Sequence, residues 1–166
     1  MNKKTVDESS IEIVMQMTHQ DANLAGNVHG GMIMKYIDTT ASIVASRHTQ
    51  GNAVTASIDR LDFHSPVFVG DLLRLHASIN YVGKTSMEVG VRVEAENFIT
   101  GQVRHTASAY LTFVPLDAQG KPRQVPSILF ESEDEIRRNC AAQERRRYRL
   151  SLRDQKPADC RGNKPL

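Results

Sequence analysis

Residues 31–48 place the strongest constraint on the fold, because between Gly31 and His48 the chain has no further glycine or proline. Apolar residues recur in this stretch at the three- and four-residue spacing of an α-helix. They are Ile33, Ile37, Ala41, Val44 and Ala45. The spacing predicts one central helix. Its surface is apolar on nearly all sides, which is typical of a helix wrapped by a sheet.

The sequence after this helix is typical of β-strands, with stretches of alternating apolar and polar residues between short glycine- or proline-containing breaks. We expect strands over residues 53–63, 72–82, 85–97 and 102–114. The last three are long and joined by short turns, which predicts an antiparallel meander. An earlier alternating stretch, from Ile11 to Met17, predicts a strand before the helix. The predicted fold class is therefore α+β, with the long helix packed on one face of a curved antiparallel sheet.

The length of 166 residues fits one domain with a short appendage. We place this domain at residues 11–126, where a proline-containing loop ends it. Residues 1–10 are polar and are expected to be frayed, and residues 127–166 form a separate C-terminal segment. The net charge of +2 is too small to indicate a nucleic-acid or membrane partner, and no stretch approaches the ~18 apolar residues of a membrane span.

The C-terminal segment carries a predicted helix. Ser132 followed by Glu135 is a capping-box pattern, and the helix is expected from Glu133 to about Leu150, with a disordered basic tail after it. The run Arg145-Arg146-Arg147-Tyr148-Arg149 lies at its end. Such a run can bind RNA or an anionic surface, but we interpret it as a solvated or subunit-contacting helix face.

The cysteines point to a reducing setting. Cys140 and Cys160 lie far apart in the polar C-terminal segment and form neither a C-x-x-C pair nor a His/Cys cluster with metal-ligand spacing. The first residues also lack the apolar run of a secretory signal. We therefore expect a cytoplasmic protein with no structural metal.

The segment 21–31, Asp-Ala-Asn-Leu-Ala-Gly-Asn-Val-His-Gly-Gly, is the most informative part of the chain for function. Gly30 and Gly31 open the predicted helix, where the first amides lack acceptors within the helix and carry the positive end of its dipole. Such amides can hold a developing oxyanion, and glycine lets a bulky carbonyl group come close. The alternative is that the two glycines serve only the packing of helix on sheet.

Asp38 follows in the body of the same helix, on a face with Met34, Ala41 and Ala45. A carboxylate among such neighbours is partly desolvated, which makes it a better base. The alternative is a solvated helix aspartate. Asn23 offers a neutral amide that can position a water or polarise a carbonyl, although an asparagine in a loop is more often a turn residue.

Segment 21–31 with Asp38 resembles the active-site segment of the acyl-CoA thioesterases, the brain acyl-CoA hydrolase and its bacterial relatives. Weaker matches follow in the family's order and extend the resemblance over residues 11–126. They are Thr55, Asp62-Phe63 with Pro66, Gly70-Asp71, residues 83–89, and Val114-Pro115-Leu116-Asp117. The resemblance implies the hotdog fold, in which two protomers join their sheets and the active sites lie at the dimer interface, often within hexamers built as trimers of dimers.

The resemblance also implies roles for individual residues. Asp38 matches the base or nucleophile, Asn23 the residue that positions water or the thioester, and the amide of Gly31, with Gly30, the oxyanion donor. The family completes this pair across the interface. The spacing agrees, because Gly31 and Asp38 are roughly 10 Å apart along the helix, too far to serve one carbonyl within one chain. His29 is interpreted as lining the pocket, with a general base as the alternative.

Coenzyme A enters this hypothesis as part of the substrate, and no cofactor is expected. Its nucleotide and phosphates favour cations and backbone amides. The candidate contacts are Arg47, His48, Thr55, Gly83, Lys84, Thr85 and Ser86. The predicted function is hydrolysis of fatty acyl-CoA, of medium to long chain by family resemblance. The alternatives are a hydratase or dehydratase of the same fold, a non-catalytic acyl-CoA-binding module and, more remotely, a nucleic-acid role through the arginine run. The sequence has no Gly-x-Ser-x-Gly motif, the motif that would indicate a serine triad.

Overall fold

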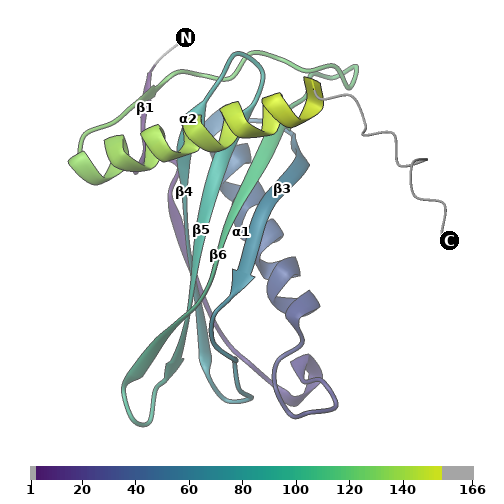
Figure 1. Ribbon diagram of the computed structural model, residues 1–166, viewed down its shortest axis with the longest axis vertical. Coiled ribbons are helices and arrows are strands. Elements are labelled where there is room, and N and C mark those ends of the chain that lie inside the picture. The colour runs from purple at the N-terminus through teal and green to yellow at the C-terminus, as the bar shows by residue number, and fades with distance from the viewer. Residues whose placement is uncertain (1–2, 155–166) are drawn as a thin grey trace, which may run out of the picture.

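The computed structural model describes residues 3–154 and contains one five-stranded antiparallel sheet with a long helix on each face (Figure 1). The strand order is β2-β4-β5-β6-β3. The strands are β2 (Ile11–Gln16), β4 (Leu72–Val82), β5 (Met87–Asn97), β6 (Gln102–Pro115) and β3 (Ala53–Phe63). The predicted α+β class, the strands and the antiparallel meander are confirmed. The β5 strand begins two residues later than expected, because residues 83–86 form the turn before it.

Helix α1 (Gly30–Thr49) packs against the face of the sheet that we call the inner face. Its apolar residues at helical spacing are buried, and the predicted central helix is confirmed. The curved sheet wraps one side of this helix, as predicted, and leaves the other side uncovered in the single chain. Met34 and Ile43 on its far side are 43% and 38% exposed, because the sheet covers only one side of the helix.

The inner face of the sheet supplies the other half of the core. Alternate residues of the three central strands point toward α1 and are fully buried, as the period of two requires. They include Leu73, Leu75, Val89, Val91, Leu111 and Phe113. This single apolar layer between helix and sheet holds the domain together, since burying each large aliphatic side chain contributes about 1.5–3 kcal/mol.

The opposite face of the sheet, which we call the outer face, carries polar and charged residues and is crossed at one end by α2 (Glu133–Asp154) (Figure 1). The predicted capping box at Ser132 is present, with the Glu135 amide donating to the Ser132 hydroxyl. The interpretation of the arginine run as a solvated or subunit-contacting face is wrong for two of its members. Arg145 pairs with Glu88 of β5, and Arg149 pairs with Asp59 of β3.

The described part of the N-terminal segment is folded rather than frayed, which corrects the sequence-based expectation. Strand β1 (Lys4–Thr5) pairs in parallel with β7 (Ile128–Leu129), and Val6 is only 2% exposed. The N-terminal strand therefore pairs with the segment that precedes α2, beside the end of α1. The expected disordered tail, with Cys160, lies outside the described residues.

Candidate functional site

Asp21 lies in the segment between β2 and α1, directly before the loop that carries Asn23. Asp21 lies in a short 3-10 helix, η1 (His19–Asp21), and its carboxylate is buried. One carboxylate oxygen accepts from the Thr18 amide and hydroxyl, both at 2.8 Å, and the other accepts from the Tyr36 hydroxyl at 3.2 Å. The hydrogen bonds from Thr18 lower the pKa of the Asp21 carboxyl below its usual range.

Asn23 lies at the base of the loop that follows, half-buried. Its side-chain oxygen accepts from the amides of Ala25 at 2.9 Å and Asn27 at 3.2 Å, and Gly26 provides the positive φ of 83° that closes the turn. The turn role that we weighed as the alternative is therefore present. Because the oxygen is occupied, the amide nitrogen of Asn23 is the group that can donate to a ligand.

The helix start is the second part of the site. Helix α1 begins at Gly30, one residue earlier than expected, with His29 as an N-cap that makes no side-chain capping bond. Within residues 3–154, the amides of Gly30 and Gly31 donate to no other backbone or side-chain group. A Cβ built on Gly30 would lie 3.7 Å from the Phe63 ring, so this ring stands directly over the helix start. The two amides can therefore receive an oxyanion, as proposed from the sequence.

Asn23 and Gly30 share one cleft of about 360 Å³. The other residues that line it are Asn27, Val28, Ile33, Phe63, His64, Ser65, Pro66 and Val67. Sequence reasoning missed Phe63 and His64 as lining residues, because they follow a strand whose register against the helix start only the fold determines. Most of the lining is apolar, with the polar groups of Asn23 and the helix start at one side, and this combination suits a thioester with an apolar chain.

Asp38 does not line this cleft. It lies eight residues beyond Gly30 on α1, about 12 Å along the axis, and is half-buried. Its carboxylate accepts a hydrogen bond of 2.6 Å from the hydroxyl of Thr55 in β3. In the described part of the chain, β3 is an edge strand of the sheet. Asp38 and Thr55 therefore lie beside an open sheet edge, and the single chain does not bring Asp38 to Asn23.

The turn predicted to contact coenzyme A lies at the other end of the sheet from the cleft. Gly83 donates to the Ser86 carbonyl to close the turn between β4 and β5, and Lys84 and Thr85 are exposed. The loop that carries Asn23 packs just before the beginning of β4, where the Val28 amide donates to the Val67 carbonyl and Asn27 pairs with Phe68. The length of β4 separates the two by roughly 33 Å.

Arg47 and His48, the other predicted contacts of coenzyme A, hold the N-terminal segment instead. Arg47 donates to the carbonyls of Ser10 at 3.1 Å and Glu8 at 3.2 Å. His48 is fully buried, with Nε2 2.9 Å from the Pro126 carbonyl and Nδ1 3.1 Å from the Ser9 hydroxyl. Burial lowers the pKa of His48. Both ring nitrogens are occupied, so we leave His48 out of the site.

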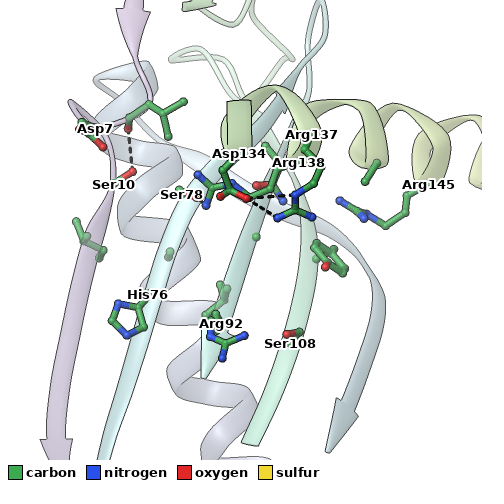
Figure 2. Close-up of a pocket in the computed structure, with 18 residues that line it drawn as sticks. Asp7, Ser10, His76, Ser78, Arg92, Ser108, Asp134, Arg137, Arg138 and Arg145 are labelled. Atoms are coloured by element: carbon green, nitrogen blue, oxygen red, sulfur yellow. Dashed lines mark hydrogen bonds and ion pairs between the residues drawn. The ribbon is translucent and has the colours of Figure 1, made fainter. Parts of the chain in front are cut away.

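A larger cavity, of about 570 Å³, lies on the outer face between α2, the N-terminal segment and strands β4 to β6 (Figure 2). Figure 2 shows Arg137 and Arg138 directed toward Asp134, and both pair with it. Arg92 pairs with Glu94 in the same way. The alternation within the strands predicted a polar outer face. It did not predict a cavity, because it does not indicate where α2 packs. Since its cations are already paired with carboxylates, this cavity has no group prepared for thioester chemistry.

Two further observations concern ligands and membranes. Among residues 3–154, no group of three or more His, Cys, Asp or Glu side chains is arranged to hold a metal ion. No helix of that part of the chain is long and apolar enough to cross a membrane. The absence of a structural metal and the cytoplasmic setting stay predictions.

The sequence is similar to acyl-CoA hydrolases. The model of the thioesterase superfamily matches residues 25–100. The acyl-CoA thioester hydrolase YkhA of Bacillus subtilis is 41% identical over 129 residues, which cover 78% of this chain and 75% of the relative. The mouse cytosolic acyl coenzyme A thioester hydrolase is 38% identical over 136 residues, which cover 81% of this chain but only 36% of the mouse protein.

Solved structures give the same result for the fold. The acyl-CoA hydrolase of Staphylococcus aureus, in complex with butyryl coenzyme A and coenzyme A, aligns with a TM-score of 0.86 at 36% identity, covering 92% of this chain and 93% of that one. A hexameric acyl-CoA thioesterase aligns with a TM-score of 0.90 at 35% identity, covering 94% and 100%. Structures of the S. aureus enzyme include variants in which one aspartate, one asparagine or one threonine is replaced by alanine.

Identity above 40% over three quarters of a relative, together with the matching fold, settles the family. The chain is an enzyme of the acyl-CoA thioester hydrolase family, built on the hotdog fold of the thioesterase superfamily.

Proposed function

We propose that this chain hydrolyses fatty acyl-CoA, of medium to long chain, to a free fatty acid and coenzyme A, at a site shared by two copies of the chain. The observation that carries the proposal is the separation of the reacting groups. Asn23 and the helix-start amides line the cleft, whereas Asp38 lies about 12 Å along the same helix, beside the edge strand. Each copy would supply one half of each site.

In the proposed reaction, the amide of Gly31, with that of Gly30, donates to the thioester oxygen as negative charge develops on it. Asn23 donates from its side-chain nitrogen to the same group or to the attacking water. The Asp38 carboxylate takes a proton from water, whose oxygen bonds to the carbonyl carbon; the carbon–sulfur bond then breaks, and the sulfur receives that proton. Direct attack by Asp38, through an anhydride that water then hydrolyses, uses the same residues.

Residue types in the S. aureus relative support this assignment. The replaced aspartate, asparagine and threonine are the three residue types that Asp38, Asn23 and Thr55 contribute here. Thr55 would hold the Asp38 carboxylate in place through its hydrogen bond of 2.6 Å. His29, exposed at the helix start, would line the entrance to the pocket.

Exposed apolar groups beside the site support a second copy as its partner. Leu24, next to Asn23, is 109% exposed, and Met34 on α1 is 43% exposed. The edge strand β3 adds Val54 and Ile58, each 40% exposed. An eleven-residue edge strand with exposed apolar side chains is a surface that proteins normally cover. Pairing of two β3 edges about a two-fold axis would cover it and would bring each Asp38 toward the other copy's cleft.

Three such dimers would form a hexamer, the assembly named for a solved relative. The turn of Gly83, Lys84, Thr85 and Ser86 is too far from the cleft of its own chain to serve it. We therefore keep this turn as a candidate contact for the coenzyme A bound at a neighbouring copy's site. The exposed Lys84 ammonium would attract the phosphates.

The test is thiol release from a panel of acyl-CoAs of increasing chain length, in wild type and in Asp38→Ala and Asn23→Ala. We expect activity to rise toward medium and long chains and to fall by about 10²–10⁴-fold in either variant. Acyl-CoA that binds without thiol release would instead favour the binding module. Activity that survives Asp38→Ala but is lost in His29→Ala would show that the base is misassigned.

A hydratase of the same fold is not favoured. It needs a histidine with an acidic partner to remove a proton next to the carbonyl. His29 is the histidine at the helix start, and within the described residues its side chain pairs with no carboxylate. The site therefore supports hydrolysis better.

A further inference from the structure

We propose that Asp21 and Tyr36 act as a positioning pair that fixes the loop carrying Asn23 and so sets the direction in which the Asn23 amide donates. The inference rests on the proposed role of Asn23 but adds two residues that touch no reacting atom. It concerns residues 22–28, the loop between η1 and the start of α1.

The carboxylate of Asp21 is held from two sides. One oxygen receives two hydrogen bonds of 2.8 Å from Thr18, which lies two residues after the end of β2. The other receives the Tyr36 hydroxyl at 3.2 Å, from the second turn of α1. Asp21 is only 7% exposed, so water does not compete strongly for these bonds. The side chain therefore links the strand before the loop to the helix after it.

The backbone of Asp21 closes the loop as well. Its carbonyl accepts from the His29 amide at 2.7 Å, and the neighbouring residues Ala22 and Val28 form an antiparallel bridge. The buried residue Asp21 therefore holds the two ends of the loop together. Between those ends, Asn23 fixes its own side-chain oxygen on the amides of Ala25 and Asn27. The orientation of the remaining NH₂ group therefore depends on how firmly the loop ends are held.

The protonation of the pair suits this role at neutral pH. The bonds from Thr18 lower the pKa of Asp21, so its carboxylate stays charged and accepts. Burial, with the negative charge of Asp21, raises the pKa of Tyr36, so the phenol keeps its proton and donates. Both oxygens of the carboxylate are already engaged within the chain, which excludes Asp21 as a base for the substrate.

Tyr36→Phe is the first test, because it removes one hydroxyl and leaves the ring. We expect kcat for thiol release to fall roughly tenfold, because a small misplacement of an orienting group is costly, with KM changed less. Thr49→Val is the matched control. It removes a buried hydroxyl bonded to the Ala45 carbonyl at the far end of the same helix, and should leave kcat unchanged. Equal kcat in Tyr36→Phe and wild type would overturn the proposal.

A double-mutant cycle separates positioning from general damage. If Tyr36 acts through Asn23, then Tyr36→Phe should cause little further loss in the residual activity of Asn23→Ala. A full tenfold loss in that background would contradict the proposal while leaving the role of Asn23 intact. If Asn23→Ala keeps wild-type activity, the proposed function itself fails, and the two failures are thereby distinguished.

Asp21→Asn against Asp21→Ala completes the test. The asparagine oxygen can still accept from Thr18, and its NH₂ can donate to the Tyr36 hydroxyl, so we expect kcat to recover most of what alanine loses. The rescue should disappear in Tyr36→Phe, where the reversed bond has no acceptor. A rescue that persists there would show that Asp21 acts through Thr18 alone and would overturn the pair.

Discussion

The two faces of the sheet are built on different principles. The inner face meets α1 through alternating aliphatic side chains, which any sequence with the right period supplies. The outer face meets α2 through individual polar pairs, among them Glu88 with Arg145, whose guanidinium also stacks on Tyr110 with 3.6 Å between its centre and the ring. An apolar layer tolerates exchange of similar residues, whereas a pairing of buried charges does not.

The outer face also shows how closely such pairs are fitted. Asn80 donates to Glu88 at 3.2 Å beneath α2, and its side chain occupies the space above Gly90 in the neighbouring strand. A Cβ at Gly90 would lie 2.4 Å from the Asn80 amide nitrogen. The glycine in the middle of β5 is thus required by a neighbour on the outer face and not by a turn.

The groups proposed to react and the groups that attach α2 lie on opposite faces of the sheet. Asn23, Asp38 and the helix-start amides belong to α1 and its borders, whereas the outer face fastens α2 and contributes no proposed reacting group. Changes to the polar side chains of the proposed site should therefore alter turnover with little loss of stability. Changes on the outer face should do the reverse, and the following predictions test this division.

The largest effect is expected for Asp38→Asn. The amide keeps an acceptor for Thr55 and similar size, so folding should be preserved, but it cannot take a proton from water. We expect kcat to fall by about 10²–10⁴-fold with an unchanged melting temperature. Thiol release and calorimetry on the same samples give both quantities. A large drop in melting temperature would mean that Asp38 also anchors the fold.

Arg145→Ala should have the opposite effect, a loss of stability with turnover unchanged. It leaves the buried Glu88 carboxylate, whose side chain is 3% exposed, without its cation, and we expect the free energy of unfolding to fall by about 3 kcal/mol. Denaturant titration measures this loss, and kcat per folded molecule should stay at the wild-type value. Arg147→Ala, on the exposed side of α2, is the control and should change little.

Thr55→Val removes the hydroxyl that holds Asp38 and keeps the shape of the side chain. The loss of one hydrogen bond to a charged group predicts a reduction of kcat by about tenfold. Ser57→Ala, two residues along β3, provides the control. If Thr55→Val were as active as wild type, the orientation of Asp38 would not depend on the edge strand.

His48→Gln should have the smallest effect, and only in acid. Burial lowers the pKa of His48 in the folded chain. As the pH falls below the ordinary histidine pKa of about 6.5, the unfolded chain therefore binds a proton that the folded chain refuses, and stability is lost. Glutamine cannot take that proton, so its unfolding free energy should fall less between pH 7 and pH 5, by about 1 kcal/mol. Identical pH profiles for the two proteins would contradict this role.

Most of the inner face could be predicted from the sequence. The bounds of α1 and the strands agree within two residues, because burial of one face forces the apolar period on each element. The candidate residues of the loop before α1 could also be predicted, since Asn23 and the two glycines lie within one segment of nine residues, 23–31. The bond between Asp21 and Tyr36 was not, because fifteen residues and a helix start separate them.

The outer face and the contacts of the N-terminal segment could not be predicted in the same way. Alternation indicates that Glu88 and Arg92 point away from α1 but does not indicate what covers them. His48 was assigned to coenzyme A because a cationic side chain at a helix end could attract phosphates, yet its partners are Ser9 and the Pro126 carbonyl, both distant in sequence. Contacts between segments that are distant in the sequence leave no periodic pattern in it, so they are seen only in the folded structure.

The central claim is that each site takes Asn23 from one copy and Asp38 from another, and mixing two inactive variants tests it most directly. Asn23→Ala and Asp38→Ala subunits, each nearly inactive alone, would be co-refolded in equal amounts and assayed for thiol release. Random pairing gives mixed dimers with one complete site each, so we predict recovery of about a quarter of the wild-type activity. Activity no higher than that of the two variants alone would show that each site is contained within one chain.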